Sequence, residues 1–139
     1  MSADLKTDVR STVEEMWRTG DTKLIDEHMA PNYVLHKPPT GFAPDREGLK
    51  AILTTMHSAF PDLRMTVEDV IAEGDKVVQR RVYQGTHKGE LFGIPATGKS
   101  VSVSQIIVSR LADGKFVEEW AETDFLGMLQ QLGAIPEMG

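Results

Sequence analysis

The stretch from Lys115 to Gly133 holds the side chains in this sequence best placed for proton-transfer chemistry. Its pattern is that of a strand, 115–123, leading into a helix, 125–132, with Asp124 at the junction. An aspartate inside an apolar pocket can act as a general acid or base, because burial favours its protonated form. An aspartate at a helix start can instead cap free backbone N–H groups. Both interpretations of Asp124 stay open at this point.

Glu118, Trp120, Glu122 and Asp124 alternate along the strand and should therefore lie on one face. That face is either a pocket wall or a solvated surface. Trp120 fits a pocket wall or the core, and a buried Glu118 would need a cationic or hydrogen-bonding partner. We expect Glu119 and Glu122 to be solvated.

Two further strands carry polar candidates for binding a substrate. Arg80 and Arg81 are adjacent in a strand predicted over 76–87, so they face opposite sides, and one should be buried or ion-paired. Arg80 is the candidate for the site. Gln105 lies in the centre of an apolar strand, 101–111, and is either a pocket donor or a hydrogen-bond partner of a second subunit. It shares its side of the strand with Val101, Val103, Ile107 and Ser109.

Histidines end two of the predicted strands. His36 precedes Pro38, and His87 follows Gly85 and Thr86. Either imidazole could lie at a pocket mouth and orient a carbonyl or share protons with a carboxylate, although a structural role is the alternative. No HxH or HExxH spacing is present, and the sequence has no cysteine, so no metal site is predicted.

Composition narrows the class of protein. The chain has 139 residues, which suits a single domain over residues 1–139. The net charge is −6 and basic residues do not cluster, which argues against a nucleic-acid partner. No apolar run reaches the roughly 20 residues of a membrane span, so no membrane association is expected. A cytoplasmic location is the default expectation.

The order of the predicted elements indicates an α+β fold. Helical periodicity covers three N-terminal segments, and strand patterns then follow one another in a meander. We therefore predict a curved antiparallel sheet wrapped over three N-terminal helices, with a short C-terminal helix. The predicted helices are 5–19, 23–28, 46–60 and 125–132, and the predicted strands are 29–36, 63–73, 76–87, 101–111 and 115–123.

Several short motifs, in this order and spacing, resemble the SnoaL-like polyketide cyclases, also called ester cyclases, of the NTF2-like superfamily. The match extends over nearly the whole chain. Its pieces are Tyr33 to Pro38, Gly85 to Gly89, Phe92 to Lys99, Asp113 to Trp120, Asp124, and Gln131 to Gly133.

The resemblance implies a cone-shaped fold with a deep apolar pocket for a carbonyl-bearing small molecule such as a polyketide. It implies an intramolecular aldol reaction without a metal or other cofactor, and a homodimer or homotetramer built by sheet packing. It assigns the general acid/base role to Asp124, so that Asp124→Ala should lose turnover and keep the fold.

Other functions fit the same scaffold. An epoxide hydrolase would need polar groups around a water, for which Asp62, Arg80 and Asp124 are the candidates. An isomerase and a non-catalytic small-molecule-binding protein are the further alternatives. A closed apolar pocket around the acid/base group would favour proton-transfer chemistry, and a filled interior would favour the non-catalytic function.

Overall fold

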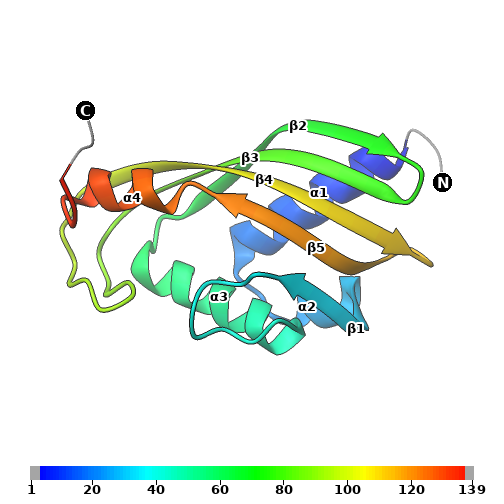
Figure 1. The fold of residues 1–139 in the computed structure, drawn as a ribbon, viewed down its shortest axis with the longest axis horizontal. Coiled ribbons are helices and arrows are strands. Elements are labelled where there is room, and N and C mark those ends of the chain that lie inside the picture. Colours follow the sequence, from blue (N-terminus) through cyan, green and yellow to red (C-terminus); the bar gives the residue numbers. More distant parts are fainter. Residues whose placement is uncertain (1–3, 137–139) are drawn as a thin grey trace.

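A computed structural model of the chain describes residues 4–136, and it has the predicted order of elements (Figure 1). The helices are α1 (Asp4–Thr19), α2 (Lys23–His28), α3 (Arg46–Ala59) and α4 (Phe125–Leu132). The strands are β1 (Met29–His36), β2 (Arg64–Glu73), β3 (Lys76–Thr86), β4 (Ser100–Ala112) and β5 (Lys115–Thr123). The α+β class is confirmed.

The strands form a five-stranded sheet in the order β1-β5-β4-β3-β2. Strands β2 to β5 make the predicted antiparallel meander. The prediction of a wholly antiparallel sheet was wrong for β1, which pairs parallel to β5. Hairpin turns specify the neighbours of consecutive strands only, and the partner of β1 is the last strand of the chain.

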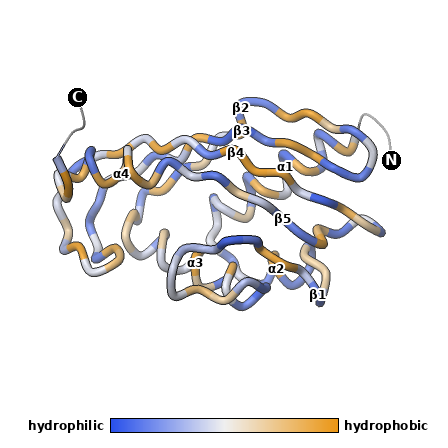
Figure 2. Tube along the Cα trace, viewed as in Figure 1, coloured by the Kyte–Doolittle hydropathy of each residue, from blue (hydrophilic) through white to orange (hydrophobic). Residues whose placement is uncertain are grey.

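The three N-terminal helices cover one face of the sheet (Figure 1). The apolar stripe of α1 is buried there, with Val9, Val13 and Met16 almost fully enclosed. Hydrophobic and hydrophilic positions alternate along the strands, as expected for a sheet buried on one side (Figure 2). Within residues 4–136, none of the helices has the length and apolar character needed to cross a membrane.

A bulge in β5 decides which of its side chains face the helices. Leu111 pairs with Phe116, but Arg110 pairs with Glu118, so Val117 is an extra residue in β5. An extra residue reverses the alternation of the side chains beyond it. Phe116 is therefore buried, and the next inward positions are Glu119 and the odd-numbered residues after it.

Candidate active site

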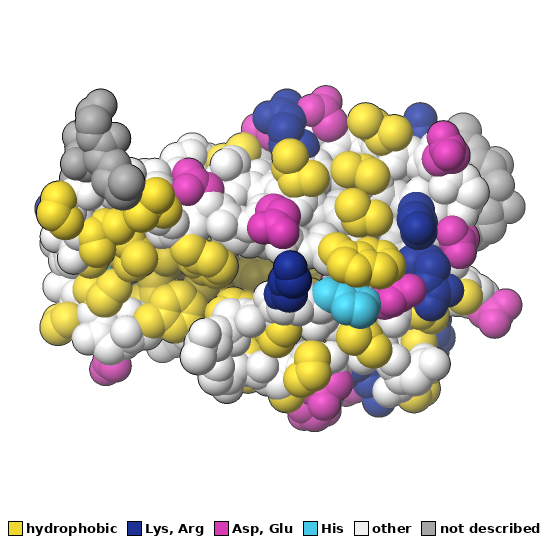
Figure 3. All heavy atoms as spheres, viewed as in Figure 1, with side chains coloured by type: hydrophobic (Ala, Val, Ile, Leu, Met, Phe, Trp, Pro, Cys, Tyr) yellow, Lys and Arg dark blue, Asp and Glu magenta, His cyan; other side chains and the backbone are white. Residues whose placement is uncertain are grey.

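A cavity of about 580 Å³ lies between the sheet and the helices. Figure 3 shows a hollow whose walls are hydrophobic side chains. The volume falls within the roughly 300–1,000 Å³ of typical small-molecule sites. Among the apolar side chains in its wall are Met16, Trp17, Leu49, Met56, Val103 and Met128.

Glu119 is the carboxylate buried in the wall of this cavity, with only 3% of its surface exposed. The expectation that Glu119 is solvated was wrong, because the bulge at Val117 turns it inward. Tyr33 of β1 donates a hydrogen bond of 2.7 Å to Oε1, and Ser109 of β4 donates one to Oε2. Both carboxylate oxygens thus have a hydroxyl donor, as a buried carboxylate requires.

A chain of hydrogen bonds links this carboxylate to the buried guanidinium of Arg81. Arg81 Nε donates to Gln79 Oε1 at 3.0 Å, and Gln79 Nε2 donates to Ser109 Oγ at 3.4 Å. Ser109 then donates to Glu119. The opposite charges are therefore joined through two neutral side chains rather than by direct contact.

Arg81 also belongs to a second polar group on the same wall. Its Nη1 donates to Tyr83 Oη at 3.2 Å, and Tyr83 donates to Gln105 Oε1 at 2.8 Å. Gln105 Nε2 donates to Thr123 Oγ1 at 2.8 Å. Gln105 was expected to be either a pocket donor or the partner of a second subunit. It lines the cavity, and its amide is bonded to Tyr83 and Thr123 of the same chain.

Burial fixes the protonation of the two tyrosines. Removal from water raises the pKa of Tyr33 well above its usual range, and the adjacent Glu119 raises it further. Burial likewise raises the pKa of Tyr83. Both phenols remain neutral O–H donors at neutral pH.

Asp124 lies outside the wall of this cavity. Its side chain is exposed and accepts a hydrogen bond of 2.9 Å from the backbone N–H of Gly127. It is thus the N-cap of α4, the alternative that the sequence left open. Asp124 instead borders a smaller, open groove with Ser104, Gln105 and Ile106.

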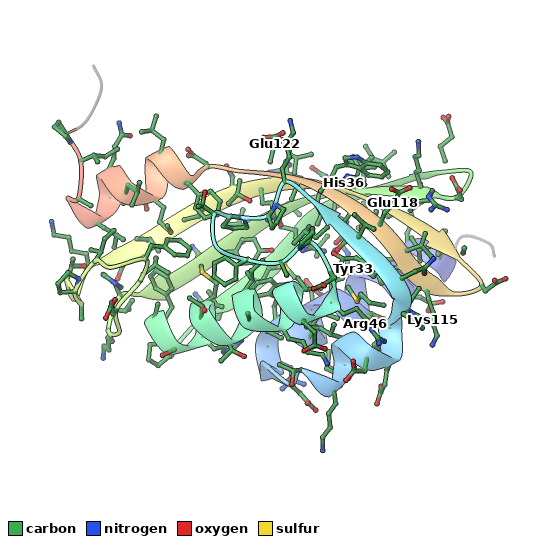
Figure 4. All side chains as sticks on the ribbon, turned by 60° about the horizontal axis from the view of Figure 1, so that its bottom comes forward. Tyr33, His36, Arg46, Lys115, Glu118 and Glu122 are labelled. Carbon is green, nitrogen blue, oxygen red and sulfur yellow. The ribbon has the colours of Figure 1, made fainter. Side chains whose placement is uncertain are left out.

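His36, Glu118 and Trp120 form a cluster on the opposite face of the sheet, with His36 and Glu118 side by side in Figure 4. The His36 ring stacks on Trp120 with centroids 4.8 Å apart, and its Nε2 lies 2.9 Å from Glu118 Oε2. Hydrogen bonds from His36 and then from Arg110 lower the pKa of Glu118. These three candidates are together, but they lie on the outer face of the sheet and not in the cavity wall.

The remaining candidates are also away from the cavity wall. Arg80 is exposed and pairs with Asp69 at 2.6 Å, whereas Arg81 is buried, which confirms that the two face opposite sides. His87 is buried, with Nδ1 accepting from the Thr97 backbone N–H, and its Nε2 has no partner among the described residues. His87 packs against Phe60, at a centroid distance of 5.6 Å.

The trio considered for epoxide hydrolysis is not assembled. Asp62 is exposed and bonded to Thr86, where hydrogen bonds from the Thr86 backbone and hydroxyl lower the pKa of its carboxyl. Arg80 and Asp124 have the separate contacts given above.

Aromatic side chains from three segments meet at the cavity. Phe92, in the loop after β3, makes edge contacts with Phe42 and Phe125, each at a centroid distance of 6.2 Å. Phe92 and Phe125 both line the cavity. The loop after β3 therefore contributes Phe92 to the cavity wall.

Sequence reasoning did not assign site roles to Tyr33, Glu119 and Ser109. A two-residue turn at Asp113–Gly114 without a bulge would place Ser109 opposite Glu118. Ser109 could have indicated the inward position of Glu119. It was correctly predicted on the side of Gln105, and a buried hydroxyl needs a polar partner on a neighbouring strand.

The family model for the SnoaL-like polyketide cyclase matches residues 7–132. The chain therefore belongs to the SnoaL-like polyketide cyclase family. It is 32% identical to the aklanonic acid methyl ester cyclase DauD of Streptomyces sp. (strain C5), over 86% of this chain and 76% of that protein. It is 30% identical to the nogalonic acid methyl ester cyclase of Streptomyces nogalater, over 84% of this chain and 89% of that protein.

Solved structures agree with this assignment. TsrD from Streptomyces laurentii superimposes with a TM-score of 0.87 at 31% identity, covering 97% of this chain and 99% of TsrD. IdmH, a putative polyketide cyclase from Streptomyces antibioticus, has a TM-score of 0.80 at 37% identity, covering 92% of this chain and 98% of IdmH. The NTF2-like fold expected from the motifs is confirmed.

Proposed function

We propose that the protein is a cofactor-independent cyclase that closes a ring in a polyketide-type substrate by an intramolecular aldol reaction. One observation carries this proposal: a buried carboxylate, Glu119, lies in the wall of a largely apolar cavity of about 580 Å³ in a member of this family. The cavity can hold an extended apolar molecule and exclude water from its reacting carbonyl groups.

Glu119 is the group that we assign to proton transfer. Its carboxylate removes a proton from the carbon next to a substrate carbonyl, leaving an enolate. The enolate carbon then forms a C–C bond to a second carbonyl, whose π electrons pass to its oxygen. Glu119 returns the proton to that alkoxide, so the product is an isomer of the substrate.

Asp124 remains the rival acid/base group, as the motif resemblance suggested. Its exposed position as the cap of α4 favours Glu119 for a reaction inside the cavity. The exposed position of Asp124 also favours a second candidate function, because the family's acid/base position then lies outside the cavity. In this function the cavity binds a small molecule and no ring closes.

The test is conversion by the purified protein without added cofactor. Aklanonic acid methyl ester and nogalonic acid methyl ester, which the names of the two relatives contain, are the first substrates to try. The proposal predicts a product of unchanged mass and altered retention in liquid chromatography. Binding of a panel of such esters without any conversion would support the second candidate instead.

The assembly and location are extensions of this proposal. We propose that residues 1–139 act as one domain in the cytoplasm, as a homodimer or homotetramer. The outer face of the sheet supports an oligomer, because a row of mostly apolar side chains lies in register across all five strands. Two of them, Ile71 and Trp120, are exposed. The row is Ile71, Val78, Val108, Trp120 and His36. Light scattering at several concentrations tests the proposal, and a monomer throughout would contradict it.

A further inference from the structure

Arg81 is a charged group in the cavity wall that has no direct charged partner. It is 4% exposed, and no carboxylate of the described residues lies within ion-pair distance of its guanidinium. Its hydrogen bonds engage Nε and Nη1 only and go to neutral oxygens, those of Gln79, Tyr83 and Gln105. Among the described residues, Nη2 has no hydrogen-bond partner.

A buried guanidinium without a carboxylate partner is suited to bind an anionic oxygen. Burying a charge costs free energy unless a counter-charge or hydrogen bonds offset it. Glu119, the buried carboxylate nearby, has both oxygens bonded to hydroxyl groups and reaches Arg81 only through Ser109 and Gln79. The guanidinium therefore keeps donor capacity for a ligand in the cavity that it lines.

We infer that the ligand of this cavity carries an anionic oxygen that accepts hydrogen bonds from Arg81, with its apolar body against the aromatic and aliphatic wall. The oxygen belongs either to a carboxylate or to the enolate of a 1,3-dicarbonyl group. The inference rests on the proposed function in taking this cavity as the substrate site.

Arg81 and Glu119 would then have separate roles at one wall of the cavity. Glu119 would transfer the proton, and Arg81 would stabilise the anionic oxygen. Because the two side chains are linked by hydrogen bonds but not in contact, a ligand can approach both. Negative charge that leaves Glu119 as it takes up a proton would pass to an oxygen near a fixed positive charge. Electrostatic stabilisation of this kind needs no movement of the protein.

The experiment compares matched small probes by isothermal titration calorimetry. The carboxylate pair is 2-naphthoate and the neutral 2-naphthamide, and the enolate pair is 5-phenylcyclohexane-1,3-dione and the neutral 3-phenylcyclohexanone. We expect the anionic member of at least one pair to bind about tenfold more tightly or better. The pair that shows the preference identifies the source of the anionic oxygen.

Variants locate the effect. Arg81→Met should remove the preference for the anion while keeping affinity for the neutral probe, and Arg81→Lys should keep part of it. Arg80→Gln is the matched control, because Arg80 is the adjacent strand residue and lies on the exposed face with Asp69. It should leave the preference unchanged.

Equal binding of anionic and neutral probes by the unmodified protein would overturn the inference, even if Arg81→Met fails to fold. In that case cavity binding and the proposed function would still stand. No binding of any probe would contradict both the inference and the use of this cavity as the ligand site.

Discussion

Tyr33 donates a hydrogen bond of 2.7 Å to Glu119, joining β1 to β5 at the wall of the cavity. The contact depends on the parallel pairing of the first and last strands. It also depends on the bulge at Val117, which turns Glu119 inward. The bond therefore makes the position of the Glu119 carboxylate depend on the pairing of the first and last strands.

Replacing Tyr33 by phenylalanine should destabilise the protein by about 1–3 kcal/mol, because a buried carboxylate oxygen loses its donor. Urea unfolding at neutral pH measures the change. Tyr83→Phe is a useful comparison, since the Tyr83 hydroxyl donates to the neutral Gln105 rather than to a carboxylate. It also accepts from Arg81, whose Nη1 keeps Gln105 Oε1 as a second acceptor. A loss no larger in Tyr33→Phe than in Tyr83→Phe would contradict the importance of the charged acceptor.

Ala121 gives a way to fill the cavity without replacing any residue of the polar network. It lines the cavity and pairs with Ile107 on β4. Ala121→Leu should reduce affinity for an apolar probe by about tenfold or more, because the added atoms occupy ligand volume. Titration of 2-naphthamide into the variant measures this. Ser104→Val, an exposed position on β4, should bind as the unmodified protein does, and equal affinity in Ala121→Leu would place the ligand elsewhere.

The outer-face cluster predicts a pH dependence of stability. Hydrogen bonds from His36 and Arg110 depress the pKa of Glu118 in the folded state. A depressed carboxyl pKa contributes stability that is present above the unfolded pKa of about 4.3 and is lost as pH falls through the folded value. Glu118→Gln should therefore lower Tm at pH 7 and match the unmodified protein in strong acid.

Melting curves of both proteins across this pH range test the prediction. Glu122→Gln serves as the control on the same strand, because none of the side-chain hydrogen bonds or ion pairs of the described residues involves Glu122. A Tm difference that persisted unchanged into strong acid would show that Glu118 acts through packing rather than charge.

Asp124 can be tested as a helix cap. Asp124→Ala should cost about 1 kcal/mol of stability, and Asp124→Asn should cost little, because asparagine also caps well. Chemical unfolding of the two variants separates them. Equal stability of both variants with the unmodified protein would argue against the observed bond to Gly127 as the reason for this residue.

Much of the fold could be predicted from the sequence because its signals are local. The helix stripes, the turns at Gly74–Asp75 and Asp113–Gly114, and the side of β4 that Gln105 occupies all follow from periodicity. The parallel place of β1 could not be predicted, since it depends on pairing with a strand about eighty positions away.

The site was harder to predict because one extra residue in β5 decides which side chains of this strand face the cavity. Strict alternation puts Glu118 and Trp120 on the side of buried Phe116, and the bulge at Val117 puts Glu119 there instead. No residue type in the sequence announces this bulge. The polar face proposed from alternation does exist, but it lies on the outside of the sheet.

The most direct test of the central claim is turnover by Glu119→Gln, an isosteric change that removes the proton acceptor. Its amide oxygen can still accept from one of the two hydroxyl groups, and its NH2 can donate to the other. With a substrate that the unmodified protein cyclises, and with Asp124→Asn measured alongside, the account predicts a loss of about 100-fold or more in kcat for Glu119→Gln. It predicts a kcat within a few-fold of normal for Asp124→Asn. Normal turnover by a folded Glu119→Gln, with loss in Asp124→Asn, would contradict it.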